Sequence, residues 1–378
     1  MTRVLVVNAG SSSLKYEVLD AETAVSVVSG LVERIGVEGS GVPDHQAALA
    51  AVLDDLDPES IDAVGHRVVH GGSVFVEATV IDDAVEAEIE RLAVLAPLHN
   101  PPGLQGIRAA RAALPFVSHV AVFDTAFHAT LPPAAYTYAI DASVAAEHGV
   151  RRYGFHGTSY RYVTRRAAEV LGRPLEELRL VVLHLGNGAS AAAVEGGRSV
   201  DTSMGMTPLE GLVMGTRSGD LDPAVLLHLQ RVGGFDTDAL DRLLNRSSGL
   251  QGLGGHSDMR DLLAAAEGGD AAAELAFEVY IRRVARYIGA YAAELGGLDA
   301  LVFTAGVGEN SALVRRRSVE RLGFLGLAVD AGRNEARSAD ARIISPDGSA
   351  VQVLVVPTNE ELQIALETVE VLAEVEHP

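Results

Sequence analysis

The chain contains no cysteine among its 378 residues. Disulfides, thiolate metal sites and cysteine nucleophiles are therefore excluded. No run of about 18 apolar residues occurs, and the N-terminal segment has no signal-peptide cleavage pattern, so we expect no membrane partner and a cytoplasmic location. The formal net charge is -21, which argues against a nucleic-acid partner because polyphosphate binding requires a basic face.

Lysine is almost absent as well. Of the 30 basic residues 29 are arginine, and the only lysine is Lys15. It stands at the exit of a turn of small and hydroxyl residues, 9–13, that is flanked by two apolar runs, a pattern typical of a β-hairpin. Asn8, Ser11, Ser13 and the compact ammonium of Lys15 together predict a cradle for nucleotide phosphates and Mg²⁺. A plain hairpin is the alternative.

The opening hairpin has a second copy later in the chain. Aligned without gaps, residues 180–196 repeat its plan, so that Gly186 falls on Gly10 and Val194 on Val18. Strand and helix patterns follow each copy in a similar order, and duplication of one α/β module explains this most simply. We therefore predict an α/β protein with two duplicated βββαβαβα (ribonuclease H-like) domains and an interdomain cleft.

Apolar periodicity and turn residues place the elements between these copies. These two signals predict strands at 24–35, 61–70 and 117–123 and helices at 44–56, 82–95 and up to residue 114. The prolines of 97–102 predict an extended, rigid loop. Residues 1–124 plus 361–378 are expected to form an N-terminal domain that binds substrate and Mg²⁺, and 125–360 a domain for nucleotide binding and dimerisation.

A series of motifs spread over residues 4–366 resembles the acetate kinase family. They are NAGSSSLK (8–15), GHRVVHGG (65–72), APLHNPPG (96–103), FDTAFH (123–128), YGFHGTS (153–159), HLGNG (184–188), TPLEGLVMGTRSGDLDP (207–223), FTAGVGEN (303–310) and PTNEEL (357–362). The resemblance implies the acetate and sugar kinase/heat-shock/actin fold and a homodimer. It also implies reversible transfer of a phosphoryl group from ATP to acetate with Mg²⁺, giving acetyl phosphate and ADP.

Transfer to a carboxylate brings two negative groups together, so positioning and charge neutralisation must supply most of the catalysis. By resemblance, Arg67 binds the substrate carboxylate, while Arg217 and His156 stabilise the transferring group. Taken alone, Arg67 also fits a structural ion pair. Asp124 matches the catalytic carboxylate of the family and is expected at an exposed strand end. Acetate is already ionised at pH 7, so we assign Asp124 an orienting role instead of that of a base.

The remaining assignments also follow from the resemblance. His99 matches an auxiliary position near the substrate, and the wall around the substrate methyl is expected to comprise Val69, Leu98, Phe155 and Pro208. Asn8 and Glu360 match the Mg²⁺ positions, with Glu361 as the rival and Mn²⁺ as a second possible ion. The segments that match nucleotide-binding positions comprise His184, Leu185, Gly186, Asn187, Gly188, Asp258, Met259, Arg260, Gly306, Val307, Gly308, Glu309 and Asn310.

Two alternatives remain open at this point. A kinase for propionate or butyrate would share the fold and most motifs. A non-catalytic ATP-dependent clamp would share the fold alone. Neither the dinucleotide pattern G-x-G-x-x-G nor the P-loop pattern G-x-x-x-x-G-K-[ST] occurs, which disfavours a Rossmann dehydrogenase and a P-loop kinase.

Overall fold

Two β-sheets carry the fold of this computed structural model, which describes residues 2–10, 13–37, 40–54 and 56–376. Within these residues each sheet has six strands, in the orders β3-β2-β1-β4-β6-β5 and β11-β12-β10-β7-β8-β9. Reading the second order backwards shows the same plan, with a three-stranded antiparallel meander followed by two parallel strands and an antiparallel edge strand. The predicted duplication and α/β class are therefore confirmed.

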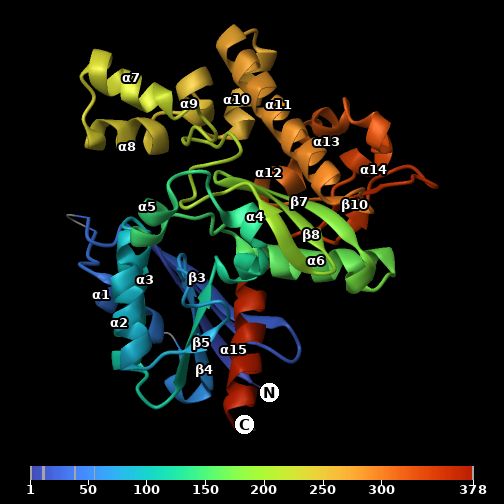
Figure 1. Cartoon of the computed structure of the whole chain (residues 1–378). Coiled ribbons are helices and arrows are strands. Elements are labelled where there is room, and N and C mark those ends of the chain that lie inside the picture. Colours follow the sequence, from blue (N-terminus) through green and yellow to red (C-terminus); the bar gives the residue numbers. More distant parts are fainter. Residues whose placement is uncertain (1, 11–12, 38–39, 55, 377–378) are drawn as a thin grey trace. The chain divides into compact units, whose positions relative to one another are not determined.

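Helices lie on both faces of the first sheet (Figure 1). Its strands are β1 (Arg3–Ala9), β2 (Ser13–Asp20), β3 (Val25–Glu33), β4 (Ala63–Val68), β5 (Thr79–Val80) and β6 (Ser118–Phe123). The helices that accompany it are α1 (His45–Asp54), α2 (Asp83–Arg91), α3 (Asn100–Ala113) and α15 (Glu360–Glu376). Helices α3 and α15 both contact β1 and β4.

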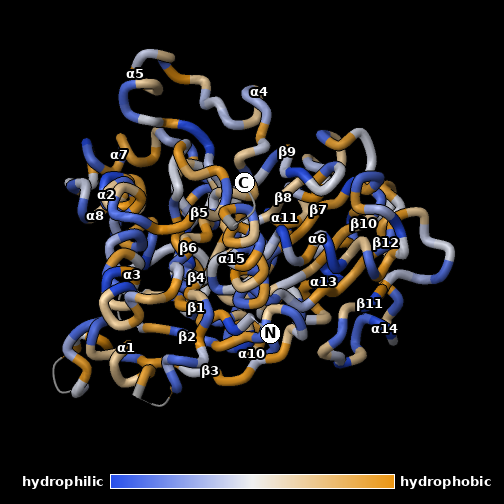
Figure 2. The backbone as a smooth tube through the Cα atoms, turned by 90° about the horizontal axis from the view of Figure 1, so that it is seen from below, coloured by the Kyte–Doolittle hydropathy of each residue, from blue (hydrophilic) through white to orange (hydrophobic). Residues whose placement is uncertain are grey.

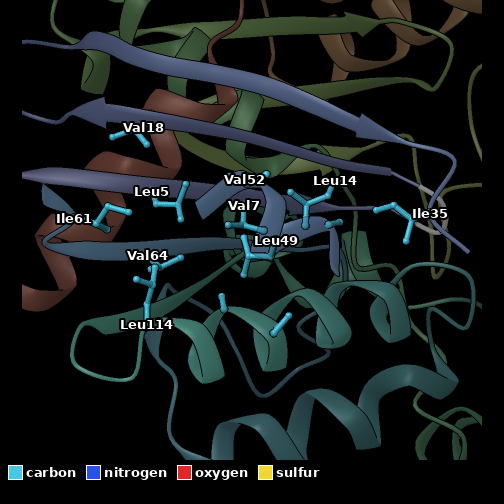
Figure 3. Packing of buried hydrophobic residues seen from close by; sticks show 13 residues of the cluster. Leu5, Val7, Leu14, Val18, Ile35, Leu49, Val52, Ile61, Val64 and Leu114 are labelled. Atoms are coloured by element: carbon cyan, nitrogen blue, oxygen red, sulfur yellow. The ribbon is translucent and has the colours of Figure 1, made fainter. Parts of the chain in front are cut away.

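Alternate residues of β1 pack into different cores. Leu5 and Val7 join the cluster that includes α1 and α3 residues (Figure 3), whereas Val4 and Val6 pack with Ile364 of α15. A strand buried on both faces needs apolar residues at consecutive positions, because neighbouring side chains point to opposite faces. This requirement explains the unbroken apolar run at the start of the chain.

The second sheet also has central strands that are buried. Its strands are β7 (Arg179–Leu185), β8 (Ala189–Glu195), β9 (Arg198–Thr202), β10 (Ala300–Thr304), β11 (Arg342–Ile343) and β12 (Gln352–Val355). All residues of β7 after the first, and all of β8 before the last, are buried. Figure 2 shows stretches of hydrophobic colour running through the strands of both sheets.

Further helices follow in the rest of the described chain. They are α4 (Pro133–Tyr136), α5 (Ala142–Glu147), α6 (Gly157–Leu171), α7 (Ala224–Gly233), α8 (Thr237–Arg246), α9 (Gly249–Gly254), α10 (Met259–Glu267), α11 (Ala271–Glu294), α12 (Ala305–Asn310), α13 (Ala312–Val319) and α14 (Ala331–Glu335). Short 3₁₀ turns occur at Pro58–Ser60, Leu92–Val94, Ala126–Thr130, Leu175–Glu177 and Gly323–Leu325. Among the described residues, none of the helices combines the length and the hydropathy that a membrane span requires.

The chain divides into two compact units. The first contains Met1–Ala129, Phe155–Tyr162 and Asn359–Pro378, and the second contains Thr130–Gly154 and Val163–Thr358. The sequence predicts boundaries at residues 124 and 361, and the structure adds Phe155–Tyr162 to the first unit. This segment carries most of the YGFHGTS motif, so the motif lies with the unit that carries Arg67 and Asp124.

One prediction was wrong in this part of the chain. Residues 97–102 were expected to form an extended loop, but α3 already begins at Asn100 and includes Pro101 and Pro102 in its first turn. Proline is tolerated there because the first amide groups of a helix have no intrahelical partner and the ring presets a helical φ. The two prolines therefore start a helix.

Candidate active site

The turn between β1 and β2 brings two predicted site residues side by side. Asn8 and Lys15 are cross-strand partners in the hairpin register, so their side chains emerge from the same face of the sheet. The Gly10 amide donates to the Ser13 carbonyl oxygen over 2.8 Å, which closes the turn. Ser11, predicted to contact phosphate, lies outside the described residues.

Arg67 and Asp124 meet at the ends of two neighbouring parallel strands, β4 and β6. Arg67 Nε donates to Asp124 Oδ1 over 3.0 Å and Nη2 donates to Oδ2 over 2.7 Å. The prediction that Asp124 is exposed was wrong, because its side chain is only 2% accessible. A carboxylate tolerates such burial when a guanidinium binds both of its oxygens. The carboxylate therefore orients Arg67.

The same guanidinium connects Asp124 to the predicted metal positions. Arg67 Nη1 donates to Asn8 Oδ1 over 3.4 Å. Burial works to lower the pKa of Arg67, but the negative charges of Asp124, Glu360 and Glu361 outweigh it and raise that pKa. Arg67 therefore stays charged and lies in the field of carboxylates from both β6 and α15.

The oxygens around Arg67 suit a hard divalent cation. Asn8 supplies an amide oxygen and Glu360 a carboxylate, a donor set typical of Mg²⁺ that keeps several waters. Glu361 forms an ion pair with Lys15, which makes Glu360 the freer carboxylate. Among the described residues no group of three His, Asp or Glu side chains could hold a metal by itself. The protein would thus provide few of the ligands.

Two residues that the sequence analysis did not single out hold the loop after β4. Asn100 accepts a hydrogen bond from the His70 amide over 3.1 Å and donates to the His70 carbonyl oxygen over 3.0 Å. Thr125 Oγ1 accepts from the Gly71 amide over 3.0 Å. The signal for Asn100 was a polar residue just before two prolines in the HNPP segment, a typical helix start.

Val69 lies two residues beyond Arg67 but just after β4, which ends at Val68. The strand predicted over 61–70 therefore ends two residues earlier than expected. The alternation nevertheless continues, because Val68 and His70 are buried while Arg67 and Val69 are partly exposed. His99 immediately precedes α3, and Leu98 is half-exposed.

The YGFHGTS motif packs against Asp124 through its backbone. The Gly157 amide donates to the Asp124 carbonyl oxygen over 2.8 Å, and a Cβ at Gly157 would collide with that oxygen. His156 has a φ of 61°, the left-handed region that strains a side chain-bearing residue. Phe155 is buried and meets the His70 ring edge-on at 5.5 Å. Phe155 and His156 thus lie in the unit that holds Arg67.

In the second unit, the HLGNG turn joins the loop that carries Arg217. His184 and Leu185 end strand β7, and Gly186, Asn187 and Gly188 form the turn to β8. The Gly215 amide donates to the Asn187 carbonyl oxygen over 2.9 Å, and a Cβ at Gly215 would collide with the Asn187 side chain. Glycine is therefore required at 215 for these two segments to approach so closely.

Arg217 differs from Arg67 in having no carboxylate partner among the described residues. Its Nη1 donates to the Pro208 carbonyl oxygen over 3.0 Å, and burial lowers its pKa. A half-buried guanidinium with unused donors is a group that can bind an incoming anion. Pro208, which was assigned to the substrate wall, is thus a neighbour of Arg217.

The other predicted nucleotide segments are helix starts. Asp258 caps α10 by accepting from the Arg260 amide over 2.8 Å, and the hydrogen bond from the Arg260 side chain lowers the pKa of Asp258 to about 2. Met259 is buried, whereas the Arg260 side chain is 90% exposed. Arg260 is therefore accessible to a ligand.

The GVGEN segment is helical. Its residues Gly306, Val307, Gly308, Glu309 and Asn310 belong to helix α12. Arg315, which the sequence analysis missed, is 2% exposed and donates to the carbonyl oxygens of Gly308 and Glu309. Burial lowers the pKa of Arg315 to about 10. A buried arginine that satisfies the last carbonyls of a short helix stabilises its end.

A family model described as the acetokinase family matches residues 3–366. This chain belongs to the acetokinase family. Among the relatives of this chain, acetate kinase of Leifsonia xyli subsp. xyli is 60% identical over 99% of this chain and 100% of its own length. Acetate kinase of Streptomyces avermitilis is 56% identical over 100% of this chain and 99% of its own length.

Solved structures agree with this membership. The acetate kinase of Porphyromonas gingivalis matches with a TM-score of 0.94 and 42% identity, covering 98% of this chain and 100% of its own. A propionate kinase from Francisella tularensis subsp. tularensis matches with a TM-score of 0.92 and 39% identity over the same shares. The family and fold predicted from the sequence are confirmed.

Proposed function

We propose that this protein catalyses the Mg²⁺-dependent, reversible transfer of a phosphoryl group from ATP to acetate, giving acetyl phosphate and ADP. The single observation that carries the proposal is the contrast between the two arginines. Arg67 is oriented by a carboxylate, whereas Arg217 has no carboxylate partner among the residues that the structure describes. Relatives at 60% and 56% identity are named acetate kinase, which supports this substrate.

The reaction in this proposal is a direct displacement. One carboxylate oxygen of acetate attacks the γ-phosphorus, a new P–O bond forms, and the bond from phosphorus to the β,γ-bridging oxygen breaks as ADP leaves with that electron pair. Acetate is ionised at pH 7, so no proton has to be removed. Asp124 therefore acts by holding Arg67, whose charge offsets that of the acetate carboxylate.

Arg217 and His156 are assigned to the phosphoryl group in transfer. A planar guanidinium can donate to two phosphoryl oxygens at once and stabilise the charge spread over them. Val69, Leu98, Phe155 and Pro208 are assigned to the acetate methyl, with His99 as an auxiliary group.

Asn8 and Glu360 would hold Mg²⁺, or Mn²⁺ in its place. The ion, when bound, neutralises charge on the phosphates of the nucleotide. Lys15, Ser11 and Ser13 are assigned to the phosphates. The rest of the nucleotide is assigned to His184–Gly188, Asp258–Arg260 and Gly306–Asn310.

The proposal extends to a homodimer in the cytoplasm. Exposed apolar side chains on and beside α7, including Leu221, Val225, Leu227 and Val232, support an interface between copies. The second candidate function is propionate kinase, which the 39% identical Francisella structure favours.

One assay tests the substrate directly. The protein is incubated with ATP, Mg²⁺ and acetate, propionate or butyrate, and the acyl phosphate is trapped as its hydroxamate. We expect acetate to be the best substrate and propionate a measurable poorer one. A higher rate with propionate would replace the proposal with its second candidate. No product from any acid would favour a non-catalytic ATP-dependent clamp.

A further inference from the structure

The loop that carries Arg217 is closed at its base. The Gly211 amide donates to Asp220 Oδ1 over 2.8 Å, and the Asp220 amide donates to the Gly211 carbonyl oxygen over 3.0 Å. Gly219 bends the chain back with a φ of 67°, and a Cβ there would collide with backbone oxygens of the loop. Residues 211–220 therefore form a lasso whose two ends are fixed to each other.

Helix α11 supplies two side chains to this base. Arg283 Nη1 donates to the Gly211 carbonyl oxygen over 2.8 Å, and Arg283 Nη2 lies 3.3 Å from the Asp220 carbonyl oxygen. The Tyr287 hydroxyl lies 3.1 and 3.0 Å from the two carboxylate oxygens of Asp220. Arg283 and Tyr287 are four residues apart and thus on one face of the helix. Each end of the lasso is bonded to a rigid element.

Neighbouring segments also hold the backbone at the tip of the lasso, since the Gly215 amide donates to the Asn187 carbonyl oxygen and the Ser218 amide donates to the Leu244 carbonyl oxygen. Arg217 has no carboxylate partner among the described residues, and its guanidinium donates to the carbonyl oxygen of Pro208. The turn above the base is closed by the Met214 amide, which donates to the Arg217 carbonyl oxygen over 3.1 Å. The direction of the Arg217 side chain consequently depends on the path of its own backbone.

We propose that Asp220, Arg283 and Tyr287 are positioning residues that fix the lasso and thereby aim Arg217 at the transferring phosphoryl group. This inference rests on the proposed function of Arg217. Donors that are already aimed at the transition state cost no reorganisation during the reaction. A displacement of about 1 Å in such a group can lower the rate about 100-fold, so loss of the base should act on kcat more than on acetate binding.

The same helix provides a matched control. Tyr280 is 1% exposed, and its hydroxyl has no hydrogen-bond partner among the described residues. Tyr280→Phe and Tyr287→Phe each remove one hydroxyl from α11 and leave the ring in place. Only the second removes contacts with Asp220. Removing an unpaired buried hydroxyl is close to neutral for stability.

The first experiment compares steady-state kinetics of these two variants, at a temperature where circular dichroism shows both to be folded. We expect Tyr287→Phe to lower kcat about tenfold or more and to change KM for acetate less than about threefold. Tyr280→Phe should leave both constants unchanged. Arg283→Lys, which loses the two-pronged contact, should resemble Tyr287→Phe, whereas Arg282→Lys on the exposed neighbouring position should not.

The second experiment separates positioning of Arg217 from a general structural effect. Tyr287→Phe is combined with Arg217→Ala and the effects on kcat are compared. If Tyr287 acts through Arg217, the double variant should be no slower than Arg217→Ala alone. Losses that multiply, or an unchanged kcat in Tyr287→Phe, would overturn the inference while leaving the proposed function intact. Absence of acyl phosphate with the wild-type protein would instead defeat the proposed function itself.

Discussion

Three arginines show how one residue type takes different roles according to its partners. Arg67 is oriented by the carboxylate of Asp124. Arg315 is buried and bonded to backbone carbonyl oxygens. Arg217 keeps unused donors in a half-buried loop. Of the three, Arg217 has the fewest hydrogen-bond partners among the described residues, so its donors suit the phosphoryl group in the proposed reaction.

Arg217→Lys is therefore expected to lower kcat far more than it weakens acetate binding. An ammonium is a point charge and cannot replace a planar fork on two phosphoryl oxygens. Loss of an arginine of this kind costs about 10³-fold or more in rate. Steady-state kinetics measure the effect, with the exposed Arg337→Lys as control. Retention of most of kcat would remove Arg217 from the mechanism.

Val69→Ala tests the wall around the acyl chain. Removing two methyl groups beside Arg67 should shift kcat/KM toward propionate about tenfold or more, mainly through KM, because one methylene is worth about 1–3 kcal/mol. Val68→Ala is the control, since Val68 belongs to the buried core and its loss should lower stability without changing the preference. If both acids lose activity equally in Val69→Ala, the pocket assignment fails.

Lys15→Ala tests the hairpin. Lys15 is half-exposed and paired with Glu361, and an exposed pair contributes about 1 kcal/mol at most. We expect a higher KM for the nucleotide and a nearly unchanged free energy of unfolding, measured with urea. Lys15→Arg keeps the charge and shows whether the compact ammonium matters. An unchanged KM for the nucleotide in Lys15→Ala would show that Lys15 does not contact the phosphates and that this segment is a plain hairpin.

At the scale of elements, two histidines connect neighbouring parallel strands. His66 of β4 and His119 of β6 stack with ring centroids 5.3 Å apart, and their nitrogens Nε2 and Nδ1 are 3.0 Å apart. His119 Nε2 also lies 3.0 Å from the Leu114 carbonyl oxygen. Burial, and then the charge that His119 would carry, hold the pKa of His66 well below its usual range. The pair is therefore neutral in the folded protein.

This pair predicts sensitivity to acid. Because the pKa of His66 is lower in the folded than in the unfolded chain, the stability is fully present above about pH 6.5 and is lost as the pH falls below that value. We expect the free energy of unfolding to drop by about 1 kcal/mol or more between about pH 7.5 and about pH 5.5. His66→Leu should reduce this drop, whereas the exposed His228→Gln should not. Equal drops in all three proteins would contradict the assignment.

The proline-rich segment shows where element prediction fails. Proline was interpreted as ending regular structure, but Pro101 and Pro102 lie in the first turn of α3. The side chain of Asn100, the first residue of α3, bonds both backbone groups of His70. This contact with the segment after β4 holds the start of the helix in place.

At the scale of the whole molecule, charge is the dominant feature. The net charge is -21, so the excess carboxylates of the folded protein repel one another. Salt screens that repulsion. Raising NaCl from about 0.05 M to about 0.5 M should therefore increase the free energy of unfolding by about 1 kcal/mol or more. KCl at equal ionic strength should act alike. A decrease would mean that the surface ion pairs, such as those of Arg108 and Arg111 with Glu86, outweigh the repulsion.

The sequence by itself determined the family, the duplicated plan and the order of most elements. Local sequence patterns encode those properties. One kind is the apolar run of a strand that is buried on both faces, and another is the long motif with a glycine where two segments approach each other closely. Gly157 and Gly215 illustrate the second kind, since a side chain at either position would collide with a neighbouring segment. Short elements such as β5 and β11, with two residues each, were too brief for such a pattern.

Only the tertiary structure decided which polar groups are partners. Arg67 and Asp124 are 57 residues apart in the chain, and they pair because β4 and β6 are adjacent parallel strands that end at the same edge. Asp220 contacts Arg283 and Tyr287 because α11 packs against the base of the loop. Helices α7 to α10 separate the two segments in the chain. Hydrogen bonds between distant segments depend on the packing of whole elements, and no local pattern of residues encodes that packing.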